Sequence, residues 1–183
     1  MKNLLLTAFV ATTLLWISCN DGGKPRQAPD GKAFTGKWTY RSLFNQTNID
    51  SSFNSLEFAR AYVHLTSRGV DSLVGQILWA IDSPPTKYTN GLNLRGSCFY
   101  DGSTLCYFLE GLGDSTLGTA GWQYNYQGYL VPKWSDGVNQ ASVLVGSIVR
   151  VKKHSCDSTG NNCAPAGVVA TTYMVKDQST IPK

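Results

Sequence analysis

The sequence predicts an all-β fold: a single antiparallel up-and-down β-barrel of about eight strands, with a β-sandwich or jelly roll as the alternative. Segments rich in β-branched and aromatic residues alternate polar and apolar side chains with a period of two. Turn residues separate these segments at short intervals. No long stretch carries a capped helical stripe. Closure into a barrel is favoured because it leaves no strand edge unpaired.

The predicted strands follow one another through hairpin turns such as Asp101-Gly102-Ser103 and Ser83-Pro84-Pro85. Residues 52–61 are the least clear, because they can also form a turn or two of helix before their strand. In order, the strands are Gly36 to Leu43, Leu56 to Thr66, Ser72 to Ala80, Gly91 to Tyr100, Thr104 to Gly111, Gly121 to Val131, Ser142 to Lys153 and Ala166 to Val175.

Residues 1–18 have the layout of a secretion signal. Lys2 precedes an apolar run from Leu4 to Ile17 that is too short for a membrane-spanning helix, and Ser18-Cys19 follows it. This arrangement resembles the lipobox of bacterial lipoproteins, although Trp16 stands where leucine is usual. The resemblance implies that Cys19 carries a lipid and anchors the chain in the bacterial cell envelope, in the periplasm or at the cell surface. Secretion with Cys19 unmodified is the alternative.

The rest of the chain divides into a tether and one domain. Residues 19–34 are rich in Gly, Pro and charged side chains and are predicted to be flexible. Residues 35–183 are predicted to form the barrel domain, since their length suits one buried core. The formal net charge of +4 is scattered along the chain, which argues against a nucleic-acid partner. The predicted partners are the membrane, through the lipid, and a small-molecule ligand.

Four further cysteines fall in two close pairs, and an exported chain meets conditions in which disulfides form. One pair is symmetric about Gly102 and the other about Thr159-Gly160, so each is predicted to be a disulfide across one hairpin. Four cysteines allow three pairings, and the spacing does not suit zinc. No metal or cofactor is predicted. The two pairs are Cys98 with Cys106 and Cys156 with Cys163.

Alternation along the strands predicts which side chains point into the barrel. Aromatic residues take the inner face at Trp122, Tyr124 and Tyr126, and again at Trp38 and Tyr40. Arg150 and Lys152 share a face that is expected to stay in water, which places Val145, Ser147, Val149 and Val151 inside. The register implied by the second cysteine pair sets Ser147 opposite Thr172 and Val149 opposite Ala170.

Small residues therefore line one wall and large aromatics another, which has two interpretations. The aromatics can fill the space that the small residues leave, giving a solid core. Alternatively, a barrel of this size can keep a cavity for one small ligand. Trp134, with Asn139 and Gln140 in the loop from Pro132 to Gln140, is the predicted lid or rim. The predicted ligand-binding residues are Trp38, Tyr40, Trp79, Trp122, Tyr124, Tyr126, Trp134, Ser147 and Thr172.

A short motif and the strand count carry a resemblance to known barrels. Gly36-Lys37-Trp38 forms a G-x-W on the first predicted strand, and about eight hairpin-linked strands follow. This pattern resembles the lipocalin and avidin group, and the resemblance implies a small ligand enclosed at the barrel mouth. The next residues, from Thr39 to Ser42, do not match the polar residues that bind biotin in avidin-like proteins, so biotin is not implied. Fold resemblance alone does not assign a function.

Three functional hypotheses follow. The first is a non-catalytic envelope lipoprotein that binds a small apolar or aromatic ligand inside the barrel. The second is a surface or adaptor module with a solid core that contacts another envelope protein or a glycan. The third, ranked below them, is a barrel isomerase or cyclase that uses Glu110, Arg95 or a tyrosine in the cavity; an ordinary ion pair between Glu110 and Arg95 is the simpler interpretation. No catalytic motif occurs and no catalytic residue is predicted.

Overall fold

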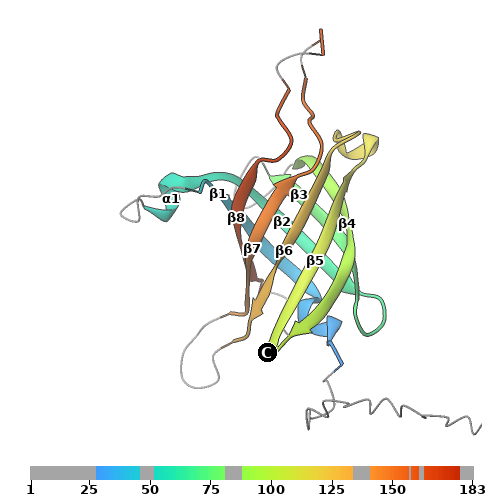
Figure 1. Cartoon of the computed structure of the whole chain (residues 1–183), viewed down its shortest axis with the longest axis vertical. Coiled ribbons are helices and arrows are strands. Elements are labelled where there is room, and N and C mark those ends of the chain that lie inside the picture. Colours follow the sequence, from blue (N-terminus) through green and yellow to red (C-terminus); the bar gives the residue numbers. More distant parts are fainter. Residues whose placement is uncertain are drawn as a thin grey trace, which may run out of the picture.

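The computed structural model describes residues 28–45, 52–80, 88–133, 141–156, 158–160 and 163–177. Eight antiparallel strands form a closed barrel, in which each strand pairs with its neighbour in sequence and β1 pairs with β8 (Figure 1). The predicted up-and-down barrel is confirmed, and the sandwich and jelly-roll alternatives are excluded.

The strand bounds agree closely with the sequence-based ranges, and those of β1 and β3 are identical to them. Residues Phe53–Leu56 form the short helix α1 in the segment where a helical turn was an option. Two 3-10 helices, η1 (Gly31–Phe34) and η2 (Ser115–Leu117), complete the described elements. The strands are β1 (Gly36–Leu43), β2 (Glu57–Ser67), β3 (Ser72–Ala80), β4 (Tyr88–Asp101), β5 (Thr104–Gly113), β6 (Gln123–Val131), β7 (Val143–Arg150) and β8 (Val169–Lys176).

The N-terminal helix η1 closes one end of the barrel. Phe34 is fully buried there and packs edge to face against Tyr107, with ring centroids 5.9 Å apart. The Trp38 indole Nε1 donates a hydrogen bond of 2.9 Å to the Phe34 carbonyl. Lys176 Nζ lies 5.3 Å from the Trp38 ring centre and donates to the Ala33 carbonyl at 3.3 Å. These contacts join η1 to the first and last strands and fix the closed end.

The interior next to this end is filled. Gly128 of β6 and Gly146 of β7 lie directly opposite each other in the sheet, and Tyr107 of β5 is the neighbour of Gly128. A Cβ atom at either glycine would come within 2.9 Å of the Tyr107 hydroxyl, so the end of this side chain lies against bare backbone. Glycines thus form the small wall at this level, in place of the predicted Ser147 and Val149, and an aromatic side chain occupies the space beside them.

The predicted inner face of β7 was wrong. Leu144 and Ile148 are buried inside the barrel, and Gly146 is opposite the buried Thr172. Alternation then places Ser147 on the outer face, along with Val145 and Val149. The register is one residue from that implied by the second cysteine pair, and a shift of one residue exchanges the two faces of a strand.

The cysteine pairs have different outcomes. Cys156 and Cys163 form a disulfide in the β7–β8 connection, as predicted. Cys98 and Cys106 are free thiols, so the other predicted disulfide was wrong. The β4–β5 hairpin turns on two residues, because Asp101 is opposite Thr104; this register sets Cys98 opposite Tyr107 and Cys106 opposite Phe99. Cys98 consequently points inward and Cys106 outward.

Residues 1–27 lie outside the described part of the chain, so the signal sequence, the lipidation of Cys19 and the tether as far as residue 27 stay predictions. The predicted tether continued to residue 34, but Gly31–Phe34 form η1 and Phe34 is buried against the barrel. No helix among the described residues is long and apolar enough to cross a membrane.

Replacing Phe34 by Ala tests the closed end. We expect the free energy of unfolding to fall by about 3–5 kcal/mol, because a buried phenyl ring is lost and leaves a cavity. Phe99→Ala is the matched control, since that ring is 46% exposed on the outer face, and it should cost about 0.5 kcal/mol or less. Urea unfolding measures both free energies, and an equal loss in the two variants would contradict the closure of this end by the buried Phe34.

The thiols provide a second test. Peptide mapping without reduction should recover Cys156 linked to Cys163, with Cys98 and Cys106 unlinked. A maleimide should modify Cys106 in the folded protein and Cys98 only after unfolding, because Cys98 is buried and its burial raises the pKa of the thiol. A peptide in which Cys98 is linked to Cys106 would overturn the register described for β4 and β5.

Candidate functional site

A cavity of about 500 Å³ opens at the end of the barrel opposite η1. This end, the mouth, is where β1, β3, β5 and β7 finish and β2, β4, β6 and β8 begin (Figure 1). Six aromatic residues line the cavity: Tyr40, Phe44, Phe58, Trp79, Trp122 and Tyr124. Its other lining residues in the described part of the chain are Ser42, Ala59, Asn90, Ile148, Arg150, His154, Val168, Val169 and Ala170.

The structure brings four of the predicted ligand-binding residues together at this cavity: Tyr40, Trp79, Trp122 and Tyr124. Trp38, Tyr126 and Thr172 are buried inside the barrel but do not line the cavity. Ser147 is on the outer face, so its predicted role in orienting a ligand was wrong. Its place on the inner side of β7 is taken by its neighbours Gly146 and Ile148.

Trp134, Asn139 and Gln140 lie outside the described residues. The strand ends that flank their segment, Val131 of β6 and Val143 of β7, lie at the closed end of the barrel. The connections at the mouth are those between β1 and β2, β3 and β4, β5 and β6, and β7 and β8.

The β5–β6 connection positions Trp122. The Asp114 carboxylate accepts a hydrogen bond of 2.7 Å from the Thr116 amide and so caps η2, and the buried Thr119 hydroxyl bonds to the Gly91 carbonyl. The Trp122 backbone is then held on both sides, with its carbonyl accepting from Gly113 at 2.8 Å and its amide donating to Thr119 at 3.0 Å. Trp122 therefore enters the mouth on a fixed turn.

A bulge in β2 brings a further aromatic residue to the mouth. Ser42 pairs with Ala59 but Leu43 pairs with Glu57, so Phe58 has no partner residue on β1. Alternation would place Phe58 outside, whereas the bulge lets both Phe58 and Ala59 line the cavity. The Phe58 ring packs on Phe44, with centroids 4.5 Å apart.

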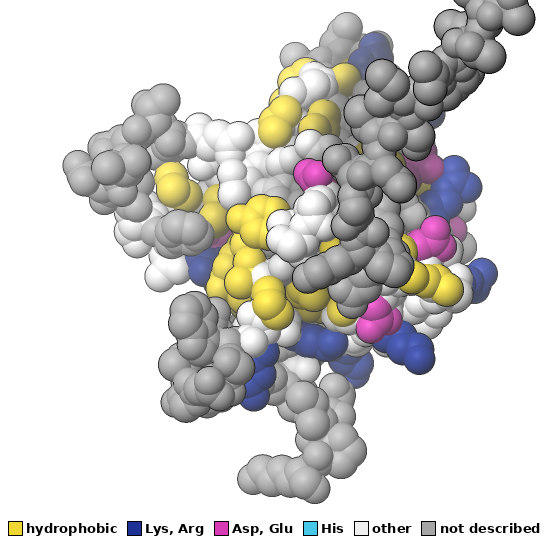
Figure 2. Space-filling view, turned by 60° about the horizontal axis from the view of Figure 1, so that its bottom comes forward, with side chains coloured by type: hydrophobic (Ala, Val, Ile, Leu, Met, Phe, Trp, Pro, Cys, Tyr) yellow, Lys and Arg dark blue, Asp and Glu magenta, His cyan; other side chains and the backbone are white. Residues whose placement is uncertain are grey.

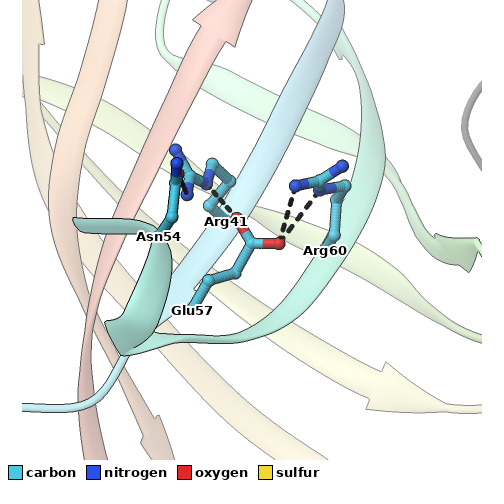
Figure 3. Close-up of polar contacts among 4 residues, drawn as sticks. All are labelled: Arg41, Asn54, Glu57 and Arg60. Atoms are coloured by element: carbon cyan, nitrogen blue, oxygen red, sulfur yellow. Dashed lines mark hydrogen bonds and ion pairs between the residues drawn. The ribbon is translucent and has the colours of Figure 1, made fainter. Parts of the chain in front are cut away.

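Glu57 secures this corner (Figure 3). Its carboxylate forms ion pairs with Arg41 of β1 and with Arg60, the latter at 2.9 Å. Arg41 also donates to the Asn54 side-chain oxygen at 2.8 Å, which ties α1 to β1. The helix α1 and the start of β2 are therefore anchored to β1 where Phe44 and Phe58 form the apolar rim.

The β7–β8 connection supplies the polar side of the mouth. Beyond Arg150 the two chain segments continue to pair, with an isolated bridge between His154 and Ala164. The Cys156–Cys163 disulfide lies next to this bridge. Arg150 Nη1 donates to the Pro165 carbonyl at 2.9 Å across the same connection. His154 therefore lines the cavity although it lies in the connection after β7, four residues beyond Arg150.

A directed chain of hydrogen bonds links these polar residues. Arg150 Nε donates to the Tyr124 hydroxyl at 3.1 Å, and that hydroxyl contacts His154 Nε2. The phenol oxygen accepts from arginine, so its own proton is free to go to Nε2. This network assigns the other proton to His154 Nδ1, which then donates to Ser155 Oγ at 2.8 Å. The imidazole also stacks on Trp122, with centroids 3.9 Å apart.

The electrostatics agree with a neutral histidine. Burial, and next the nearby Arg150 guanidinium, lower the pKa of His154. Burial raises the pKa of Tyr40, and the hydrogen bond between the Tyr40 and Ser42 hydroxyls offsets this rise only in part. At neutral pH, Arg150 is then the one charged group among the described residues that line the cavity.

Sequence reasoning missed Arg150, His154, Phe44 and Phe58 as cavity residues. Arg150 was placed outside because a guanidinium needs water, but at a barrel mouth the inner face also reaches solvent. Phe58 depends on a bulge that alternation cannot show. The contact between Arg150 and Tyr124 could be predicted only with the register of β6 and β7, in which the two residues are directly opposite.

The ion pair of Glu110 with Arg95 forms as predicted, at 2.8 Å, and Gln123 also donates to Glu110 at 2.8 Å. All three lie on the outer face, since the neighbouring Leu109 is fully buried inside. The hypothesis that Glu110 or Arg95 acts within the cavity was therefore wrong.

The outer wall also carries an apolar surface near the closed end, and Figure 2 shows hydrophobic side chains gathered on the face turned forward there. Phe99 of β4, Cys106 of β5 and Tyr129 of β6 form one row across the sheet. Phe108 lies two residues along β5. The three aromatic rings are each about two-fifths exposed, at 46% for Phe99, 39% for Phe108 and 43% for Tyr129.

No family model matches this chain, and neither the curated proteins nor the solved structures with which it was compared gave a significant match. The described residues contain no cluster of three or more His, Cys, Asp or Glu side chains that could hold a metal ion. The case for a function therefore rests on the geometry of the mouth.

His154 gives a pH-dependent prediction. Its pKa in the folded protein is lowered, so the unfolded chain takes up a proton first as the pH falls below about 6.5. We expect its nuclear magnetic resonance titration midpoint to lie below 6.5. The chain has two histidines, so His64→Gln leaves one resonance to follow.

The same shift should appear in stability. Between about pH 7.5 and about pH 5, the wild-type protein should lose more free energy of unfolding than His154→Gln, because only the wild type must protonate this imidazole on unfolding. Urea unfolding at the two pH values measures the difference. A titration midpoint above 6.5, or a larger loss in the variant, would contradict the hydrogen-bond chain described above.

Proposed function

We propose that this protein binds a small, partly apolar or aromatic molecule in the mouth of its barrel, without catalysis. The observation that carries the proposal is the cavity of about 500 Å³, open at one end and lined by six aromatic side chains. Binding sites for small molecules have volumes of roughly 300–1,000 Å³ and place a few polar groups among apolar walls.

The arrangement of the aromatic rings supports a ligand with a flat or apolar body. Trp79 and Trp122 meet edge to face with centroids 6.2 Å apart, and Tyr40 contributes its ring from β1. Exposed rings at the rim, Phe44 and Phe58, leave apolar surface that a ligand would cover. Paired strands and the hydrogen-bonded turn before Trp122 hold these side chains, so little conformational freedom would be lost on binding.

The proposal includes the location inferred from the sequence. An anchor at Cys19 would hold the domain at the bacterial envelope, where the cavity would meet molecules outside the cytoplasm. The adaptor hypothesis finds support in the outer row of Phe99, Cys106 and Tyr129, since exposed apolar surface marks contact sites. It also required a solid core, and the mouth is open, so ligand binding is the better-supported function.

Filling the cavity tests the proposal. Ala59 lines the mouth, and Ala59→Trp should block it while leaving the barrel folded. Thr39→Trp adds the same side chain on the exposed outer face of β1 and serves as the control. The neutral fluorescent probe N-phenylnaphthylamine (NPN) should bind the wild type and Thr39→Trp equally, and Ala59→Trp at least about tenfold more weakly.

Circular dichroism would show that both variants keep the barrel. Native mass spectrometry of the soluble domain, expressed in its own host, would add a direct search for a retained molecule. The proposal would be abandoned if Ala59→Trp bound NPN as well as the control does, or if the wild type bound no NPN and retained no molecule.

A further inference from the structure

We propose that the ligand is an amphipathic anion whose carboxylate or similar acidic group binds Arg150, while its apolar body lies against the aromatic wall. This inference rests on the proposed ligand-binding function and names the class of ligand. It starts from the position of one cation on the inner face of a barrel.

Arg150 ends β7 directly opposite Tyr124, and both side chains line the cavity. Its guanidinium carbon lies 5.8 Å from the centre of the Tyr124 ring. Placing a guanidinium against aromatic and aliphatic side chains removes part of its hydration, which is costly unless an acceptor or a counter-charge replaces the water. Its position therefore calls for a partner.

The described protein groups compensate this charge only in part. The bonds from Nε to the Tyr124 hydroxyl and from Nη1 to the Pro165 carbonyl use two of the five N–H groups of the side chain, and both acceptors are neutral. None of the described ion pairs includes Arg150, and the described lining of the cavity contains no Asp or Glu. Within the described part of the mouth, a positive charge thus stands without a carboxylate to balance it.

The neighbouring bonds also orient this arginine. The Tyr124 hydroxyl accepts the hydrogen bond from Arg150 Nε and donates one to His154 Nε2. The His154 ring is in turn held by stacking on Trp122. The guanidinium plane is therefore fixed from one side, which suits the two parallel bonds that arginine forms with a carboxylate. A preset donor costs less conformational entropy on binding than a free side chain does.

Apolar side chains flank Arg150 on the side of β8. The Arg150 amide donates a hydrogen bond of 2.9 Å to the Val168 carbonyl, and Val169 begins β8. Farther round the mouth, Phe44 follows the end of β1 and Phe58 lies in β2. A ligand whose acidic group contacts Arg150 would extend its body over these residues. A neutral apolar molecule would fill the same volume but leave the guanidinium without a counter-charge, so the site should prefer the anion.

Two fluorescent probes with the same aromatic skeleton separate the charge from the body. Anilinonaphthalene sulfonate (ANS) carries an acidic group, and NPN lacks it. Replacing Arg150 by Gln should weaken ANS binding about tenfold or more, since a hydrogen-bonded charge pair is lost, and should change NPN binding by less than about twofold. Arg150→Lys, which keeps the charge without the fork, should retain more ANS affinity than Arg150→Gln does.

Arg95→Gln is the matched control, because it removes an arginine from the outer face and should leave both probes unchanged. If a variant fails to fold, the salt dependence of probe binding to the wild type still tests the inference. At about 1 M salt, where the Debye length is about 3 Å, ANS binding should weaken while NPN binding does not.

The outcomes distinguish this inference from the function on which it rests. If NPN binds and ANS does not, or if Arg150→Gln weakens the binding of both probes equally, the ligand does not need an acidic group. The proposed ligand binding would still hold. If the wild type binds neither probe and retains no molecule, the proposed function fails and this inference fails with it.

Discussion

The structure depends on the pairing of β1 with β8, because this pairing turns a row of hairpins into a closed surface. The register runs from Trp38 opposite Lys176 to Leu43 opposite Thr171. Closure sets the inside and outside of every strand and leaves no edge exposed. It also brings Trp38 and Lys176 together, and these two side chains hold η1 over one end. The pairing of β1 with β8 therefore gives an interior that is closed at one end and open at the other.

The sequence allowed either a solid core or a ligand cavity, and the barrel interior contains both at different levels. Near η1 the core is solid, with Tyr107 resting against the facing glycines of β6 and β7. The hydroxyls of Tyr107 and Thr172 lie near each other there but outside hydrogen-bond geometry. Toward the mouth, aromatic side chains line the cavity and do not fill it. The same alternation of large and small residues thus supports stability at one level and a candidate site at the other.

Much of the fold could be predicted from the sequence, since strand ranges depend on local alternation and turn residues. The faces of β1 and β6 were correct because aromatic and polar side chains alternate there without ambiguity. The face of β7 was wrong because Arg150 was expected to need the outer face to reach water, whereas the inner face also reaches solvent at the mouth. The pairing of Cys98 was wrong because it depended on a register, and a register is fixed by the length of a turn. The two-residue turn at Gly102-Ser103 moved the symmetry of that hairpin by half a residue.

The site was predicted only in part, since four aromatics were found and the polar residues were not. His154 belongs to a connection and Arg150 to a strand end, and alternation is a weak guide in both places. The closure of one end also sets a direction. The chain enters the barrel through η1, so the mouth faces away from the side at which the preceding segment joins. If that segment is held at a surface, the cavity is presented outward, where a diffusing molecule reaches it without passing beneath the domain.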